Sequence, residues 1–95
     1  METHVNKIAA IVYSALGHDC NYFHDFTSDM APLAQQALGA ASFIREMDSP
    51  TPNQIAAVVY ACMGYLVEVG YDFSTDKRYM ASIAYRAALA IMEVD

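Results

Sequence analysis

The chain has 95 residues, of which 56% are hydrophobic, and its net charge is −6. This length fits one domain, residues 1–95, with a core of its own, and the apolar content excludes a disordered protein. The charge disfavours nucleic acid and anionic membranes as partners, because phosphate binding needs clustered lysine and arginine and the chain has only five basic residues.

Membrane insertion and secretion are also disfavoured. The longest apolar run without a charge covers residues 55–67, which is shorter than the roughly 18 residues that a spanning helix needs. The opening METHVNK lacks a basic segment followed by an apolar one, so we expect no secretory signal. The two cysteines form no CxxC pattern, and we expect reduced thiols, with Cys62 in the core, in a cytoplasmic protein.

Four helices are predicted along the chain, near residues 4–22, 28–47, 51–69 and 75–94. The apolar residues of the third step by four and three, which traces one helix face: Ile55, Val59, Cys62, Leu66 and Val69. Its start is marked by Thr51 as N-cap, Pro52 at the first position and Gln54 completing a capping box.

The second and fourth helices follow two similar segments, DFTSD at 25–29 and DFSTD at 72–76. We expect Asp29 and Asp76 to lie at the positive end of each helix dipole, and Pro32 to lie in the first turn of the second helix. Phe26 and Phe73 precede these helices, and we expect them to fix each loop to the core.

The chain also repeats itself at an interval of 47 residues. Residues 6–48 align with residues 53–95 without a gap, and 17 of the 43 pairs are identical. The match runs through the DFTSD and DFSTD segments, where no helical period operates. We therefore predict an internal duplication, with a Pro-containing link at 48–52. Convergence of two helical stretches through similar composition is the alternative.

Two helical hairpins joined by a short link predict an all-α four-helix bundle with a pseudo-twofold axis. The second and fourth helices carry alanine faces that allow close helix packing: Ala34, Ala37 and Ala41, and Ala81, Ala84 and Ala88. A short solenoid-like stack is the other architecture considered, although solenoids need about three repeats for stability.

The first and third helices are apolar around their whole circumference, which is typical of helices buried on all sides. Because four helices alone cannot bury two of their members fully, we expect apolar surface here that meets another chain, most simply in a homodimer. The residues of this predicted interface are Ala9, Ala10, Tyr13, Ala56, Ala57 and Tyr60. The alternative is that alanines are small enough to be tolerated at the surface.

A possible metal site lies in the segment HDCNYFHD at 18–25. His18, Cys20 and His24 are candidate ligands, with Asp19 or Asp25 to complete a set. The spacing matches no zinc motif, and a structural zinc site needs four ligands. A polar, solvated helix end is the alternative, and no cofactor is predicted.

Aromatic and acidic residues are the candidates for binding a protein partner. Tyrosine is common among binding hot spots, and carboxylates at one end of a bundle would suit a basic partner, although helix capping also explains aspartates before a helix. The candidate residues are Tyr22, Phe23, Tyr65, Tyr71, Tyr79, Tyr85, Asp25, Asp29, Asp72 and Asp76.

Enzyme signatures are absent from the sequence: it has no phosphate-binding glycine loop, no HExxH and no GxSxG. The hypothesis that fits best is a small interaction protein that regulates or inhibits a larger protein by binding it. Phage anti-defence proteins and bacteriocin immunity proteins act in this style, although no motif of either group is present. The alternative is a helical bundle that binds a metal or small ligand through residues 18–25.

Overall fold

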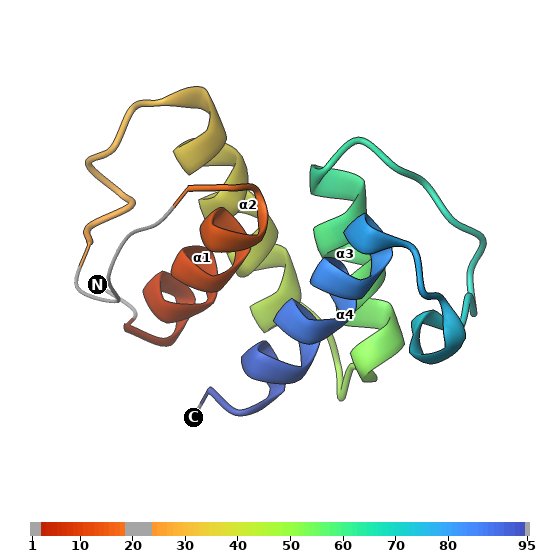
Figure 1. Ribbon diagram of the computed structural model, residues 1–95. Coiled ribbons are helices and arrows are strands. Elements are labelled where there is room, and N and C mark those ends of the chain that lie inside the picture. Colours follow the sequence, from red (N-terminus) through yellow and green to blue (C-terminus); the bar gives the residue numbers. More distant parts are fainter. Residues whose placement is uncertain (1–2, 19–23, 95) are drawn as a thin grey trace.

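The computed structural model describes residues 3–18 and 24–94 (Figure 1). Within these residues the chain forms helices and no strands, which confirms the all-α prediction. The helices are α1 (Thr3–Ala15), α2 (Pro32–Glu46), α3 (Pro52–Cys62) and α4 (Tyr79–Met92), with a 3₁₀ turn η1 (Phe73–Thr75) before α4. None of the described helices has the length and apolarity needed to cross a membrane.

The helices associate in two pairs. α1 packs against α2, α3 packs against α4, and lesser contacts of α1 with α4 and of α2 with α3 join the pairs. Figure 1 draws residues 24–31, which lead into α2, on one flank of the molecule and the segment between α3 and α4 on the opposite flank. The two connecting loops are therefore separate surfaces.

α1 and α3 end well before the predicted boundaries at 22 and 69, and glycine is the reason. Gly17 and Gly64 have φ of 99° and 100°, the left-handed conformation that side chains oppose. The Gly17 N–H donates to the Ser14 carbonyl, and the N–H of His18 donates to the carbonyl of Tyr13. This is the Schellman pattern of helix termination. The same two hydrogen bonds follow α3, at Gly64 and Tyr65.

α2 and α4 begin later than predicted, so the expected dipole role of Asp29 and Asp76 is wrong. Asp29 lies two residues before the N-cap Ala31 and accepts a hydrogen bond from its N–H at 3.0 Å. Asp76 does the same for the N-cap Arg78, also at 3.0 Å. Each carboxylate shapes the turn that leads into the helix, and neither lies inside the first helical turn.

The start of α3 confirms the sequence prediction in detail. The Thr51 side chain accepts from the Gln54 N–H at 3.2 Å, and the Gln54 side chain accepts from the Thr51 N–H at 2.8 Å. Pro52 occupies the first helical position, where its missing N–H costs nothing. Pro32 likewise begins α2.

The core is made of small side chains. The predicted alanine faces of α2 and α4 are fully buried, and they pack with the apolar faces of α1 and α3. Phe26 and Phe73 are 0% and 1% exposed, which confirms that they fix the loops to the core. They are the two largest fully buried side chains among the described residues.

Candidate functional site

An asparagine on α1 organises the loop before α2. Asn6 is buried, and its Oδ1 accepts from the Phe26 N–H at 3.2 Å while its Nδ2 donates to the His24 carbonyl. The ring of Phe26 meets the edge of Tyr13, with centroids 5.4 Å apart. The side chain thus satisfies backbone groups of a loop that has no regular structure of its own.

The corresponding positions of the second helix pair make two of these contacts. Asn53 Oδ1 accepts from the Phe73 N–H at 2.9 Å, and the ring of Phe73 meets Tyr60 at 5.3 Å. Asn53 Nδ2 is turned to Asp72 Oδ1 at 3.4 Å. These contacts form the loop frame of each helix pair: an asparagine, a phenylalanine and a tyrosine.

The two loops differ in the side chains that contact their second aspartate, which is Asp29 in the first loop and Asp76 in the second. In the first loop His24 Nε2 lies 2.7 Å from Asp29 Oδ2. Hydrogen bonds from the Ala31 N–H and from His24 lower the pKa of the Asp29 carboxyl.

In the second loop Asp76 is held by two side chains. Arg78 Nη2 lies 2.6 Å from Asp76 Oδ2, and the Tyr71 hydroxyl donates to the same oxygen. The bonds from Arg78 and Tyr71 hold the pKa of the Asp76 carboxyl well below its usual range. Accordingly the pKa of Tyr71 is raised, mainly by its bond to Asp76, and the pKa of Arg78 is raised by the same carboxylate.

The candidate metal ligands are not gathered in the part of the chain that the structure describes. His18 stacks on the ring of Tyr13 at 4.9 Å, and His24 is engaged with Asp29. Cys20 and Asp19 lie outside the described residues. Among the residues described, no group of three or more histidine, cysteine or acidic side chains could hold a metal ion.

The four aspartates predicted for partner binding were expected at one end of the molecule, but they do not lie together. They belong to the two loops that lie on opposite flanks (Figure 1). Asp25 accepts from Thr27 through both its N–H and its hydroxyl, and Asp72 does the same with Ser74. These bonds lower the pKa of both carboxyls. All four aspartates therefore have roles inside their own loops.

The predicted apolar interface lies mostly inside the chain. Ala9, Ala10, Ala56 and Tyr60 are buried, and Tyr13 and Ala57 are half-buried. The contacts between the two helix pairs, together with the loop phenylalanines, cover most of the circumference of α1 and α3. Cys62, expected in the core, is half-buried, and burial raises the pKa of its thiol.

The tyrosines predicted for partner binding differ in exposure. Tyr79 is 75% exposed and Tyr65, which stacks on Tyr60, is 45% exposed. Tyr71 and Tyr85 are half-buried and pack against the core. The predicted Tyr22 and Phe23 lie outside the described residues.

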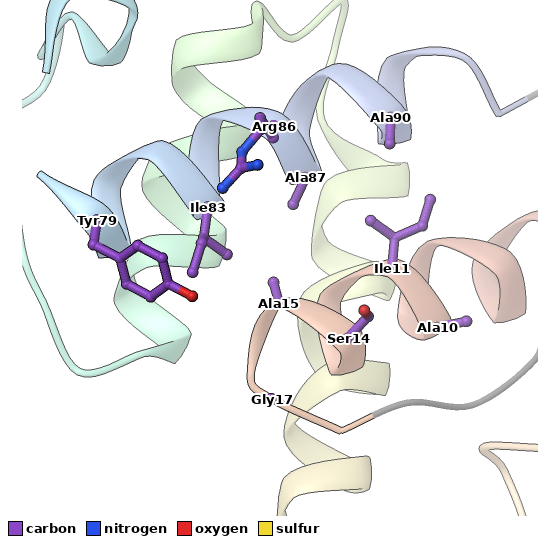
Figure 2. A pocket seen from close by; sticks show the side chains of 10 residues that line it. All are labelled: Ala10, Ile11, Ser14, Ala15, Gly17, Tyr79, Ile83, Arg86, Ala87 and Ala90. Carbon is purple, nitrogen blue, oxygen red and sulfur yellow. The ribbon is translucent and has the colours of Figure 1, made fainter. Parts of the chain in front are cut away.

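A groove of about 540 Å³ runs between α1 and α4. Figure 2 shows Ile11 and Ala15 extending from α1 toward α4, while Ile83 and Ala87 extend from α4 toward α1. Alanines keep the groove wide because their side chains end at Cβ. The full lining is Ala10, Ile11, Ser14, Ala15, Gly17, Tyr79, Ile83, Arg86, Ala87 and Ala90.

One positively charged side chain lines this apolar groove. Arg86 carries the only formal charge in its lining, and its Nε is 3.4 Å from the Ser82 carbonyl of its own helix. No carboxylate within residues 3–18 and 24–94 forms an ion pair with this guanidinium. The hydroxyls of Ser14 and Tyr79 are the other polar side-chain groups in the groove (Figure 2). The site can thus accept an apolar segment that carries a negative charge.

Among the described residues, the most exposed apolar side chains lie in the segment that follows α3. Leu66 is 89% exposed and Val69 is 106% exposed. Glu68 lies between them in the sequence, and its carboxylate forms no hydrogen bond or ion pair with a described side chain. We call residues 65–69 the apolar loop. Both side chains were predicted on a helix face, and the early end of α3 at Gly64 instead leaves them in solvent.

Sequence reasoning missed the groove because the groove depends on how α1 meets α4. A signal was nevertheless present in the repeat. The positions of Ile83, Arg86 and Ala90 correspond to Gln36, Gly39 and Phe43, so the two helices differ in chemistry along this face. On the other side of the molecule Gln36 Nε2 donates to the carbonyl of Cys62, 3.1 Å away on α3.

Comparisons with protein-family models, with curated proteins and with solved structures found no match for this chain.

Proposed function

We propose that this chain is a small protein–protein interaction module that acts by binding, as a regulator or inhibitor of a larger protein or complex. The observation that carries the proposal is the groove between α1 and α4, an apolar depression that holds a cation without a partner carboxylate among the described residues. Concave apolar sites with a few polar groups are the usual form of binding sites. A cytoplasmic location and the absence of catalysis belong to the same proposal.

The exposed side chains support binding over catalysis. Leu66, Val69 and Tyr79 are large apolar side chains that are 89%, 106% and 75% exposed, and a partner could cover them. The polar clusters at Asp29 and Asp76 are hydrogen-bonded within their own loops. These groups position backbone and hold no reactive side chain over the groove.

We further infer that the two helix pairs are duplicated hairpins of one four-helix bundle. The inference is supported by the matching contacts of Asn6 with Phe26 and of Asn53 with Phe73. Matched Schellman ends at Gly17 and Gly64 support it as well. On this basis the shared contacts maintain the fold, whereas α4 contributes groove residues that differ between the two copies.

Native mass spectrometry of the tagged chain, drawn gently from a lysate of its own host, tests the proposed function. The wild type is expected to carry a stoichiometric protein partner. Ile83→Glu, which places a charge on the groove wall, is expected to lose that partner. Ile83 is half-buried and is not among the side chains packed on the core, so the fold should tolerate the change.

Met30→Glu provides the matched control. Met30 is 78% exposed in the first loop, and its replacement adds the same charge away from the groove. Retention of the partner by Met30→Glu and its loss by Ile83→Glu would support the groove as the binding surface. A partner that survives Ile83→Glu unchanged would contradict the proposed function as it is assigned to this site.

A further inference from the structure

Two surfaces of this molecule each combine apolar side chains with one charged group. The groove between α1 and α4 is apolar and carries the cation Arg86. The apolar loop at 65–69 is exposed and carries the carboxylate of Glu68 between Leu66 and Val69. A cation in one and an anion in the other, each among apolar side chains, make the two surfaces complementary in charge and in polarity.

We infer that the groove of one copy of this chain receives the apolar loop of a second copy, with Glu68 of one copy facing Arg86 of the other. This inference rests on the proposed function and names the partner of the groove. The larger protein that the module regulates would then meet the assembled dimer. The inference commits to self-association because a single chain carries both halves of the contact.

The backbone of the apolar loop suits this role. Residues 65–68 form no helix, and Leu66 and Val69 extend from the fold without covering by other side chains. A segment without helical structure is narrow enough to lie between two helices when four of the ten residues that line the groove are alanine (Figure 2). Burial of Leu66 and Val69 against Ile11 and Ile83 would remove apolar surface of both partners from water.

The charge pair would set the register of the contact. Apolar side chains on alanine give little directional preference, whereas a carboxylate placed among them must reach a cation or remain in water. Arg86 can offer its guanidinium, because among described residues its Nε–H is shared only with the carbonyl of Ser82. Such pairs contribute to specificity more than to raw affinity.

A twofold axis would close the assembly. Each copy has one loop and one groove, so two copies related by such an axis would exchange both contacts, as in the commonest form of soluble oligomer. The corresponding positions of the first helix pair could not form this contact. The counterpart of Arg86 is Gly39, and the counterpart of Ala90 is Phe43, which is 60% exposed.

Charge reversal in the full chain tests the inference. Sedimentation equilibrium is expected to show a dimer for the wild type. Glu68→Arg faces Arg86 with a like charge, and Arg86→Glu faces Glu68 with one, so each variant alone is expected to dissociate at least about tenfold more readily. Both side chains are exposed, and circular dichroism with thermal unfolding verifies that each variant is folded.

Mixing the two variants is the decisive step. In a mixed dimer the arginine introduced by Glu68→Arg in one chain meets the glutamate introduced by Arg86→Glu in the other. The second contact pairs the unaltered Arg86 with the unaltered Glu68, so both contacts have opposite charges. The mixture is expected to form a heterodimer, whereas each variant alone is expected to dissociate. Glu46→Arg makes the same charge change as Glu68→Arg at an exposed position of α2, and it should leave dissociation unchanged.

The outcomes separate this inference from the proposed function. A wild type that stays monomeric, a dimer insensitive to both reversals, or a mixture that fails to recover would overturn the inference. If Ile83→Glu still releases a foreign protein in that case, the groove remains a binding surface and only its occupant changes. If Ile83→Glu releases nothing from the tagged chain, the proposed function fails as well.

Discussion

The two helix pairs share a frame and differ at their surfaces. In both, an asparagine accepts from the N–H of a buried phenylalanine, and that ring meets a tyrosine of the preceding helix. Their differences lie outside this frame. The first pair uses His24 with Asp29, and the second uses Tyr71 and Arg78 with Asp76 and adds an exposed apolar loop.

This comparison separates residues that stabilise the fold from exposed residues that we propose for binding. The shared frame residues, such as Asn6 and Phe26, are buried and hydrogen-bonded within the chain, so a change there alters stability. Leu66 and Arg86 differ between the pairs, are exposed and contribute little to the core. Four sets of variants test this division, from the largest expected effect to the smallest.

Replacement of the loop phenylalanines should have the largest effect. Phe26→Ala and Phe73→Ala each leave a cavity at a fully buried position, and each is expected to lower the free energy of unfolding by about 3–5 kcal/mol. Urea denaturation of the two variants measures it. If one variant lost much less than the other, the two frames would not be equivalent.

The asparagines should come next, and here the two pairs should differ. Asn6→Ala and Asn53→Ala each remove the acceptor of a phenylalanine N–H, a loss of about 1–3 kcal/mol. Asn6 also donates to the His24 carbonyl and is the more deeply buried, so Asn6→Ala should cost more. Exposed Lys7 gives the control, since Lys7→Ala should unfold as the wild type does.

The acid stability of the second loop should depend on Asp76. The pKa of this carboxyl is lowered in the folded state, so its contribution to stability is complete above the unfolded pKa of about 4. That contribution is lost as pH falls toward the lower folded pKa. Asp76→Asn should therefore be less stable than the wild type at neutral pH and should lose less stability on acidification.

Denaturation at a series of pH values measures this difference. Asp29→Asn gives the comparison in the first loop, where the pKa of the carboxyl is also lowered but its partners are the Ala31 N–H and His24. Parallel pH curves for the wild type and Asp76→Asn would show that the bonds from Arg78 and Tyr71 do not stabilise the fold.

The apolar loop should show the smallest effect on stability. Leu66→Asp introduces the residue type found 47 positions earlier, at Asp19, and the side chain is almost fully exposed. The free energy of unfolding should change by no more than about 0.5 kcal/mol. Self-association should weaken in the same variant. A large loss of stability at low protein concentration would place Leu66 with the frame instead.

Much of the fold could be predicted because local signals agreed with the final structure. The capping box at Thr51, the alanine faces and the two loop phenylalanines are all as expected. The helix ends could not be read from apolar spacing alone, because Leu66 and Val69 continue the helical period beyond Gly64. The positive φ of Gly64 ends the helix there, so Leu66 and Val69 lie in a loop.

The groove between α1 and α4 could not be predicted from the sequence for a different reason. It joins residues of α1 and α4, and their contact follows from tertiary packing that no periodicity encodes. The predicted interface residues Ala9 and Ala56 are buried by that same packing. Tyr79, predicted from its aromatic character to bind a partner, lies at the groove, whereas no sequence pattern pointed to Arg86.

Isoleucine methyl signals in NMR spectra test most directly whether the groove is a binding surface. Ile11 and Ile83 line the groove, while Ile8, Ile44, Ile55 and Ile91 are buried in the core. In a dilution series of the chain, and in its complex isolated from the host, the two groove signals are expected to shift while the four core signals stay in place. Binding accompanied by no shift at Ile11 and Ile83 would contradict the account.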